Sequence, residues 1–245
     1  MTGFSPQPTE VGDQRAEALR AGLADVRERV ARACDAAGRD PAEATVIVVT
    51  KFFPASDVRR LAALGIHDMG ENRDQEASAK YADVRADTPG IRLHFIGQLQ
   101  TNKARSVARY ADVVHTVDRP SLVSALTRGA QLAGRGLDVL VQVNLDPGAA
   151  GRGGAEPDDL PQLVSAVRAS GVLRLRGVMA VAPLQEDPDE VFGRLAGIAE
   201  GVRALVPEAT WLSAGMSADM EAAIRHGATH LRVGTAILGS RPPLR

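Results

Sequence analysis

The order of apolar and polar positions along the chain alternates between two patterns. Across residues 13–37, apolar side chains recur at three- and four-residue steps, which is the spacing of one helix face. Residues 45–50 then form a β-branched run without polar alternation, which is typical of a strand covered on both faces. Short apolar runs and amphipathic stretches keep alternating up to residue 233. The pattern therefore predicts alternating strands and helices.

This alternation predicts one closed barrel. The predicted strands are residues 45–50, 66–69, 93–96, 113–117, 139–144, 175–181, 210–213 and 230–233, and helices are predicted at 13–37, 56–64, 119–133, 158–170, 188–205 and 218–226. Eight such units in 245 residues fit a single α/β (β/α)₈ TIM-type barrel with an additional N-terminal helix better than an open doubly wound sheet. Because no linker divides the chain, we expect a flexible N-terminal tail at 1–12 and one barrel domain at 13–245.

Composition excludes several classes of function. The 29 Lys and Arg residues balance 30 Asp and Glu, which gives no bulk electrostatic reason to bind nucleic acid or an anionic membrane. No apolar run approaches the roughly 20 residues that span a bilayer, and the first twelve residues do not resemble a signal peptide. Cys34 is the single cysteine, so neither an intramolecular disulfide nor a cysteine zinc cluster can form. We therefore expect a cytoplasmic protein without a metal site.

Lysine is scarce, which narrows any amine chemistry to three residues: Lys51, Lys80 and Lys103. Lys51 directly follows the most apolar strand and precedes Phe52 and Phe53, so it lies where barrel sites form. Apolar surroundings lower the pKa of an amine, and a neutral amine can form a Schiff base with an aldehyde or ketone. Position alone leaves a second interpretation open, in which Lys51 only extends its ammonium to water from a strand end.

The other two lysines are predicted to be less reactive. Lys80 lies in a strongly polar helix and is interpreted as a solvated surface charge. Lys103 lies at a predicted helix start, and both a surface position and a phosphate contact remain open.

The last two predicted strands point to an anion site. Ser217 follows strand 210–213 as the predicted N-cap of a helix, a role that needs no ligand. Gly234 and Thr235 follow strand 230–233 and open a short helix-like turn. Loops after the seventh and eighth strands form the recurrent phosphate site of such barrels. Together with Lys51, they suggest a ligand with a carbonyl at one end and a phosphate at the other, as in pyridoxal phosphate (PLP).

Six stretches, in order, carry a family resemblance: VTKFFPASDVRRLAALGIHDMGENRDQEA, LHFIGQLQTNKAR, VHTVDR, VLVQVNL, LRGVMAVAP and LSAGMSADMEAAIRHGATHLRVGTAILGSR. They resemble the motifs of the pyridoxal phosphate homeostasis protein family, which is similar to the N-terminal barrel domain of alanine racemase. The resemblance covers roughly residues 16–241. It implies PLP as the cofactor, held as an aldimine on Lys51.

The resemblance also implies the surroundings of the cofactor. Arg232 would face the pyridine nitrogen, and because an arginine stays protonated it would keep the ring a poor electron sink. Asn72 would lie at the barrel mouth after the second strand, and His94 would be a packed barrel histidine. The residues implied around the phosphate are Ser213, Ser217, Gly234 and Thr235.

The chain departs from the family pattern in three places. Ala214 stands in the Ser-Ala-Gly-Met-Ser segment where the family has methionine, and Gln98 replaces a common histidine. The loop at 146–154 is richer in glycine than expected, and we interpret it as a mobile flap.

Three functions remain open at this point. Racemisation needs a second acid or base opposite the lysine, which alanine racemase takes from a tyrosine of a separate C-terminal domain. Here we expect no such domain, and Tyr81 and Tyr110 lie in helical segments away from the predicted mouth. The resemblance thus implies a non-catalytic, monomeric PLP carrier that transiently meets PLP-dependent apo-enzymes. A PLP-dependent racemase is the alternative, and a Schiff-base lyase of the aldolase type is disfavoured by the motifs.

Overall fold

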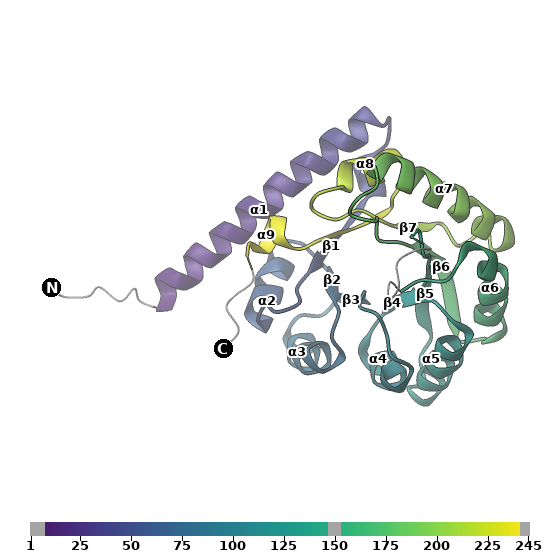
Figure 1. Ribbon diagram of the computed structural model, residues 1–245. Coiled ribbons are helices and arrows are strands. Elements are labelled where there is room, and N and C mark those ends of the chain that lie inside the picture. Colours follow the sequence, from purple (N-terminus) through teal and green to yellow (C-terminus); the bar gives the residue numbers. More distant parts are fainter. Residues whose placement is uncertain (1–7, 147–152, 241–245) are drawn as a thin grey trace.

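The computed structural model describes residues 8–146 and 153–240, and for residues 8–13 it describes only the helical backbone. Most of the predicted flap (147–152) and residues 1–7 of the predicted tail lie outside the described residues. Within the described part, eight parallel strands follow one another in sequence order, and β8 pairs with β1 to close the barrel (Figure 1). The strands are β1 Thr45–Val49, β2 Asp68–Glu71, β3 Arg92–Phe95, β4 Val113–Val117, β5 Leu137–Gln142, β6 Leu173–Met179, β7 Trp211–Ser213 and β8 His230–Val233.

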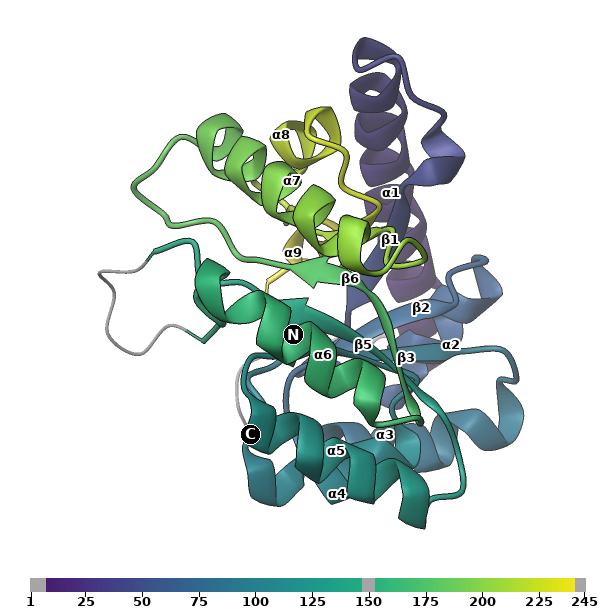
Figure 2. The same cartoon turned by 90° about the vertical axis from the view of Figure 1, so that its right-hand side faces the viewer.

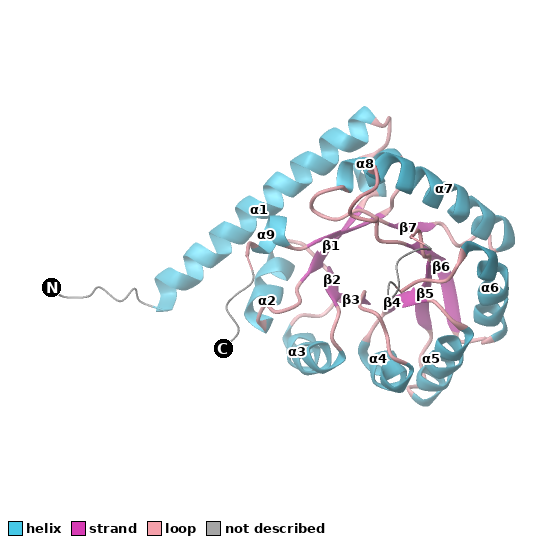
Figure 3. Cartoon of the chain, viewed as in Figure 1, coloured by secondary structure: helices cyan, strands magenta, loops and turns pink. Residues whose placement is uncertain are grey.

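Helices surround the strands, so the predicted TIM-type barrel is confirmed (Figure 3). None of the described helices is both long enough and apolar enough to cross a membrane. The helices are α1 Pro8–Ala36, α2 Ala55–Ala63, α3 Asp74–Asp87, α4 Ala104–Tyr110, α5 Pro120–Leu132, α6 Leu160–Ala169, α7 Pro188–Leu205, α8 Met220–Arg225 and α9 Thr235–Leu238. Short 3₁₀ turns, Pro41–Glu43, Thr101–Lys103 and Pro157–Asp159, precede β1, α4 and α6.

Some element boundaries differ from the prediction. The second strand was expected at 66–69 but is Asp68–Glu71. Ile66 is instead held at the turn that follows α2, because its N–H donates to the carbonyl of Leu61 at 3.0 Å while Gly65 turns the chain at φ +80°. The strand predicted at 139–144 begins two residues earlier, at Leu137. A β-branched run shows that a strand exists, whereas hydrogen bonds at its ends decide where it begins.

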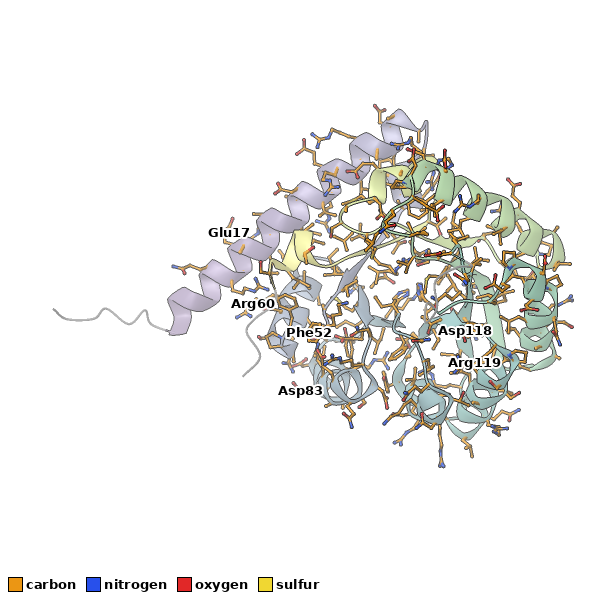
Figure 4. All side chains as sticks on the ribbon, in the orientation of Figure 1. Glu17, Phe52, Arg60, Asp83, Asp118 and Arg119 are labelled. Atoms are coloured by element: carbon orange, nitrogen blue, oxygen red, sulfur yellow. The ribbon has the colours of Figure 1, made fainter. Side chains whose placement is uncertain are left out.

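The N-terminal helix α1 packs outside the barrel against α8 and α9, beside β1 (Figure 1 and Figure 2). Leu19, Leu23 and Val26 on its inner face are buried, whereas Glu17 projects from its outer face (Figure 4). At Gly22 an added Cβ would lie 2.9 Å from the carbonyl oxygen of Ala236 in α9. The absence of a side chain at this position therefore lets the first and last helices touch through their backbones.

A glycine inside the sheet provides a first test of the fold. At Gly177 in β6, φ is +154° and an added Cβ would lie 1.8 Å from the carbonyl oxygen of Trp211. We expect Gly177→Ala to lower the free energy of unfolding by about 3 kcal/mol, since the paired strand β7 would have to move. Urea unfolding measures this change.

Gly197 in α7 is the matched control, because an added Cβ there meets nothing within 4 Å. We expect Gly197→Ala to raise the free energy of unfolding by about 0.5–1 kcal/mol through helix propensity. Equal effects of the two substitutions would contradict this account.

Candidate cofactor site

Lys51 lies two residues after the end of β1, and hydrogen bonds hold the peptide groups on both sides of it. The carbonyl of Thr50 accepts from Lys80 Nζ at 2.9 Å, and the N–H of Phe52 donates to Glu76 Oε1 at 2.5 Å. Phe52 has φ +68°, a left-handed backbone conformation that costs free energy in a residue with a side chain. The hydrogen bond to Glu76 offsets part of that cost. The backbone of Lys51 is therefore positioned by α3 as well as by β1.

The group that holds this turn, named here the Lys80 clamp, consists of Lys80, Glu71 and Glu76. Lys80 Nζ lies 2.7 Å from Glu71 Oε1 and 3.0 Å from Glu76 Oε1, and the side chains of Lys80 and Glu71 are 7% and 0% exposed. Thr50 Oγ1 also donates to Glu71 Oε1, at 2.7 Å. Burial raises the pKa of Glu71, although the Lys80 ammonium and the Thr50 hydroxyl act against that rise. The clamp is a buried ion pair at the carboxyl ends of β1 and β2.

The prediction that Lys80 is a solvated surface charge is therefore wrong. Helix α3 buries Ala77, Tyr81 and Val84 against the barrel, and Lys80 beside them reaches polar groups at the ends of β1 and β2. Because the short buried stripe is surrounded by charged residues, the sequence of α3 looks like that of a solvated helix. The available signal was the spacing of Glu76 and Lys80, four residues apart on one helix face.

Removing the cation of the clamp has a large expected effect on stability. Lys80→Met would leave the Glu71 carboxylate buried without its partner, and we expect the free energy of unfolding to fall by about 3 kcal/mol. Thermal unfolding measures this loss. Arg32→Ala is the control, because Arg32 pairs with Glu28 on the exposed surface of α1 and such pairs contribute little. A change for Lys80→Met as small as that for Arg32→Ala would contradict the clamp.

The loops after β7 and β8 bring two hydroxyl groups together. Ser217 Oγ lies 3.4 Å from Thr235 Oγ1, and Gly234 directly precedes α9, whose first residue is Thr235. The prediction that Ser217 caps a helix is wrong, because α8 begins only at Met220. Asp219 Oδ1 accepts from the N–H of residue 216 at 2.6 Å and closes the intervening turn. Ser217 therefore does not cap α8, and its hydroxyl oxygen accepts from the Thr235 hydroxyl.

Arg232 and Ser213 meet inside the barrel. Arg232 is 5% exposed, and its Nη1 donates to Ser213 Oγ at 2.8 Å while its Nη2 donates to the carbonyl of Ala180 at 2.8 Å. Burial lowers the pKa of Arg232 to about 10, so the guanidinium stays charged at neutral pH. Arg232 pairs in register with Ile47 of β1. Ser213 is fully buried and therefore supports Arg232 from within the barrel.

Asn72 follows β2 and lines a cavity of about 820 Å³ at the ends of β2, β3 and β4. Its Oδ1 is buried and has no hydrogen-bond partner among the described residues. Lys103 stands at the same cavity, 42% exposed, with Nζ 3.9 Å from Asp74 Oδ2. Arg119 also lines this cavity and lies toward α5 in Figure 4. Phe52, which follows Lys51, is labelled there on the α2 side of the barrel.

The structure therefore forms two groups of the residues predicted for the site. Ser217 and Thr235, with Gly234, form the first group, and Ser213 and Arg232 form the second. Lys51 follows β1, which pairs on one side with the strand of Arg232 and on the other with β2, the strand that precedes Asn72. The Lys80 clamp was missed because it depends on how α3 packs.

Comparison with known proteins identifies the class of this barrel. Residues 21–242 match the family model described as alanine racemase, N-terminal domain. PipY of Synechococcus elongatus, solved with PLP bound, is 33% identical, with a TM-score of 0.76, over 90% of this chain and 100% of that chain. The fold and the site thus define a barrel of the alanine racemase N-terminal type.

Relatives within this class are closer still. A pyridoxal phosphate homeostasis protein of Mycobacterium tuberculosis is 44% identical over 94% of this chain and 95% of its own length. Its counterpart in Escherichia coli is 39% identical over 89% of this chain and 95% of its own length. The chain belongs to the pyridoxal phosphate homeostasis protein family, as the motifs predicted.

Proposed function

We propose that this protein holds PLP covalently at the barrel mouth, through a Schiff base on Lys51, and serves PLP homeostasis by buffering the cofactor and delivering it to apo-enzymes. The observation that carries this proposal is the backbone of Lys51, fixed on both sides at the end of β1. A fixed backbone restricts the positions that the amine can reach, which reduces the entropy lost when a bond to the ligand forms. The bound cofactor supplies an aldehyde as the reactive group.

The residues around the mouth fit the other parts of PLP. Ser217 and Thr235 present neighbouring hydroxyls that can donate to a phosphate, with Gly234 beside them. Arg232 stays charged and can donate to an unprotonated pyridine nitrogen, while Ser213 fixes its position. Asn72 carries a buried amide oxygen that lacks a partner among the described residues, so its amide group is available for the ring substituents.

The tyrosines favour a carrier over a racemase. Tyr81 is 1% exposed, and its hydroxyl lies 3.3 Å from Thr50 Oγ1 between α3 and the barrel. Tyr110 donates to Asp74 Oδ1 at 3.1 Å. Burial raises the pKa of both phenols, so neither is suited to accept a proton near neutral pH. With no other tyrosine in the sequence, the chain offers no phenol as the second base of a racemase.

Absorbance and peptide mapping test the proposal. Purified protein is mixed with PLP, its visible absorbance is recorded, and borohydride reduction is followed by mass spectrometry of the peptides. We expect the label on Lys51 alone. A label only on Lys80 or Lys103, or no visible band, would contradict the binding proposal.

Delivery needs a separate assay. The PLP-loaded protein is mixed with the apo-form of a PLP-dependent enzyme, and recovery of that enzyme's activity is measured against an equal total concentration of free PLP. We expect activity to recover in both cases, and we expect no steady conversion of amino-acid enantiomers by the loaded protein alone. Sustained racemisation that Lys51→Ala abolishes would replace the carrier by the racemase.

A further inference from the structure

A chain of hydrogen bonds crosses the barrel interior and ends at Arg232. Asp68 Oδ1 lies 2.8 Å from His94 Nε2, and His94 Nδ1 lies 2.8 Å from His115 Nε2. His115 Nδ1 lies 3.0 Å from Ser213 Oγ, which accepts from Arg232 Nη1 at 2.8 Å. These five residues, named here the interior chain, come from β2, β3, β4, β7 and β8. The interior chain therefore connects the amino end of β2 to the proposed cofactor site.

The two ends of the interior chain determine the direction of every bond in it. A guanidinium can only donate hydrogen bonds and an ionised carboxylate can only accept them. Because Ser213 accepts from Arg232, the Ser213 hydroxyl proton is free to donate to His115 Nδ1. His115 must then carry its proton on Nε2 and donate to His94 Nδ1. His94 in turn carries its proton on Nε2 and donates to Asp68.

Burial keeps the middle of the interior chain uncharged. His94 and His115 are both fully buried, and burial lowers the pKa of each, most strongly for His115. Burial alone would raise the pKa of Asp68, but the hydrogen bond from His94 and the nearby Arg92 guanidinium lower it overall, so Asp68 is ionised at neutral pH. Neutral, oriented groups thus link the buried cation of Arg232 to a carboxylate four hydrogen bonds away.

We propose that His94 and His115 are positioning residues for the cofactor site, because they hold the Ser213 hydroxyl as a permanent acceptor for Arg232 and so fix the guanidinium that faces the ligand ring. This inference rests on the proposed function, in which Arg232 donates to the pyridine nitrogen of PLP. Without His115, the Ser213 hydroxyl can rotate and Arg232 loses a fixed partner. A bound ring would then meet a guanidinium that is less well oriented.

The direction of the interior chain can be tested without PLP. Nitrogen-15 NMR of histidine-labelled protein at pH 7 distinguishes the two neutral tautomers, and single His→Phe variants assign the signals. We expect His94 and His115 both to carry the proton on Nε2. A proton on Nδ1 of either residue, or a charged imidazole, would overturn the inference.

The effect on the ligand is tested with His115→Phe, which removes both hydrogen bonds of that ring. We expect PLP affinity to fall about tenfold, the cost of one lost buried hydrogen bond, and the absorbance maximum of bound PLP to shift. His230→Phe is the matched control, because His230 is a buried barrel histidine that bonds to Thr229 outside the interior chain. We expect the control to stay within twofold of wild type with an unchanged spectrum.

Rescue separates hydrogen bonding from packing. In His115→Asn, the side-chain oxygen can replace Nδ1 as the acceptor for Ser213, and we expect the wild-type absorbance maximum to return. Equal spectra for His115→Phe and wild type, or equal shifts for His115→Phe and His230→Phe, would overturn the inference while leaving PLP binding intact. Wild-type protein that binds no PLP would instead overturn the proposed function, and the inference with it.

Discussion

Lys51→Ala will abolish the visible absorbance band of the PLP-loaded protein and weaken PLP binding roughly a hundredfold, because the covalent bond is lost while the phosphate contacts remain. The fold should persist, since Lys51 lies in a turn after β1 and the clamp bonds go to the backbone of its neighbours. Absorbance titration and equilibrium dialysis measure the two effects.

Lys103→Ala is the control for this substitution, because Lys103 lies at the cavity rim and is 42% exposed. We expect this variant to keep the band and to bind PLP within about threefold of wild type, the cost of one exposed charge contact. A band that survives Lys51→Ala would show that another amine holds the cofactor.

Buried histidines will cause this protein to unfold in acid at a higher pH than protonation of its carboxylates alone would cause. His94, His115 and His230 are buried, and burial lowers the pKa of each, for His230 to about 3. The unfolded chain binds protons at these histidines near pH 6.5, whereas the folded protein does not. Their contribution to stability is therefore complete above about pH 6.5 and is lost as the pH falls toward the folded pKa values.

The size of this effect follows from proton linkage. His230, whose pKa is about 3 in the folded protein, removes about 1.4 kcal/mol per pH unit below pH 6. His94 and His115 act in the same direction, whereas Glu71, whose pKa is raised by burial, acts in the opposite direction. We expect the free energy of unfolding to fall between pH 6.5 and pH 4.5, and His230 alone to contribute about 2 kcal/mol to that loss. Urea unfolding at several pH values measures the slope, and His230→Phe should make it shallower. Stability that is constant from pH 7 to pH 5 would contradict this prediction.

The barrel was predictable because its signal is local. Each strand is a short apolar run and each helix an amphipathic stretch, so their order along the chain defines the fold. Lys51 was predictable for a similar reason, since it directly follows the first predicted strand and barrel sites lie at the carboxyl ends of strands. The ends of elements were less predictable, as Ile66 illustrates, because backbone hydrogen bonds at the helix end decide them.

The interior chain could not be predicted from local pattern. His94 and His115 are 21 residues apart, and His115 and Ser213 are 98 residues apart, so only closure of the barrel brings them together. Each histidine alone is compatible with packing, and that interpretation is correct as far as burial is concerned. The sequence pattern does not show which ring nitrogen of each histidine faces which neighbour.

The contact between Gly22 and α9 also bears on how the chain reaches its folded state. Helix α1 leaves the ribosome before the barrel strands, and the backbone partner of Gly22 at Ala236 lies 214 residues later in the sequence. Contacts between residues so far apart form late, because the intervening chain must first be ordered. During synthesis, the apolar face of α1 therefore stays without its final partner until α9 has been made. Docking of α1 on α9 and pairing of β8 with β1 then complete the turn that carries Gly234 and Thr235, which we propose contacts the phosphate.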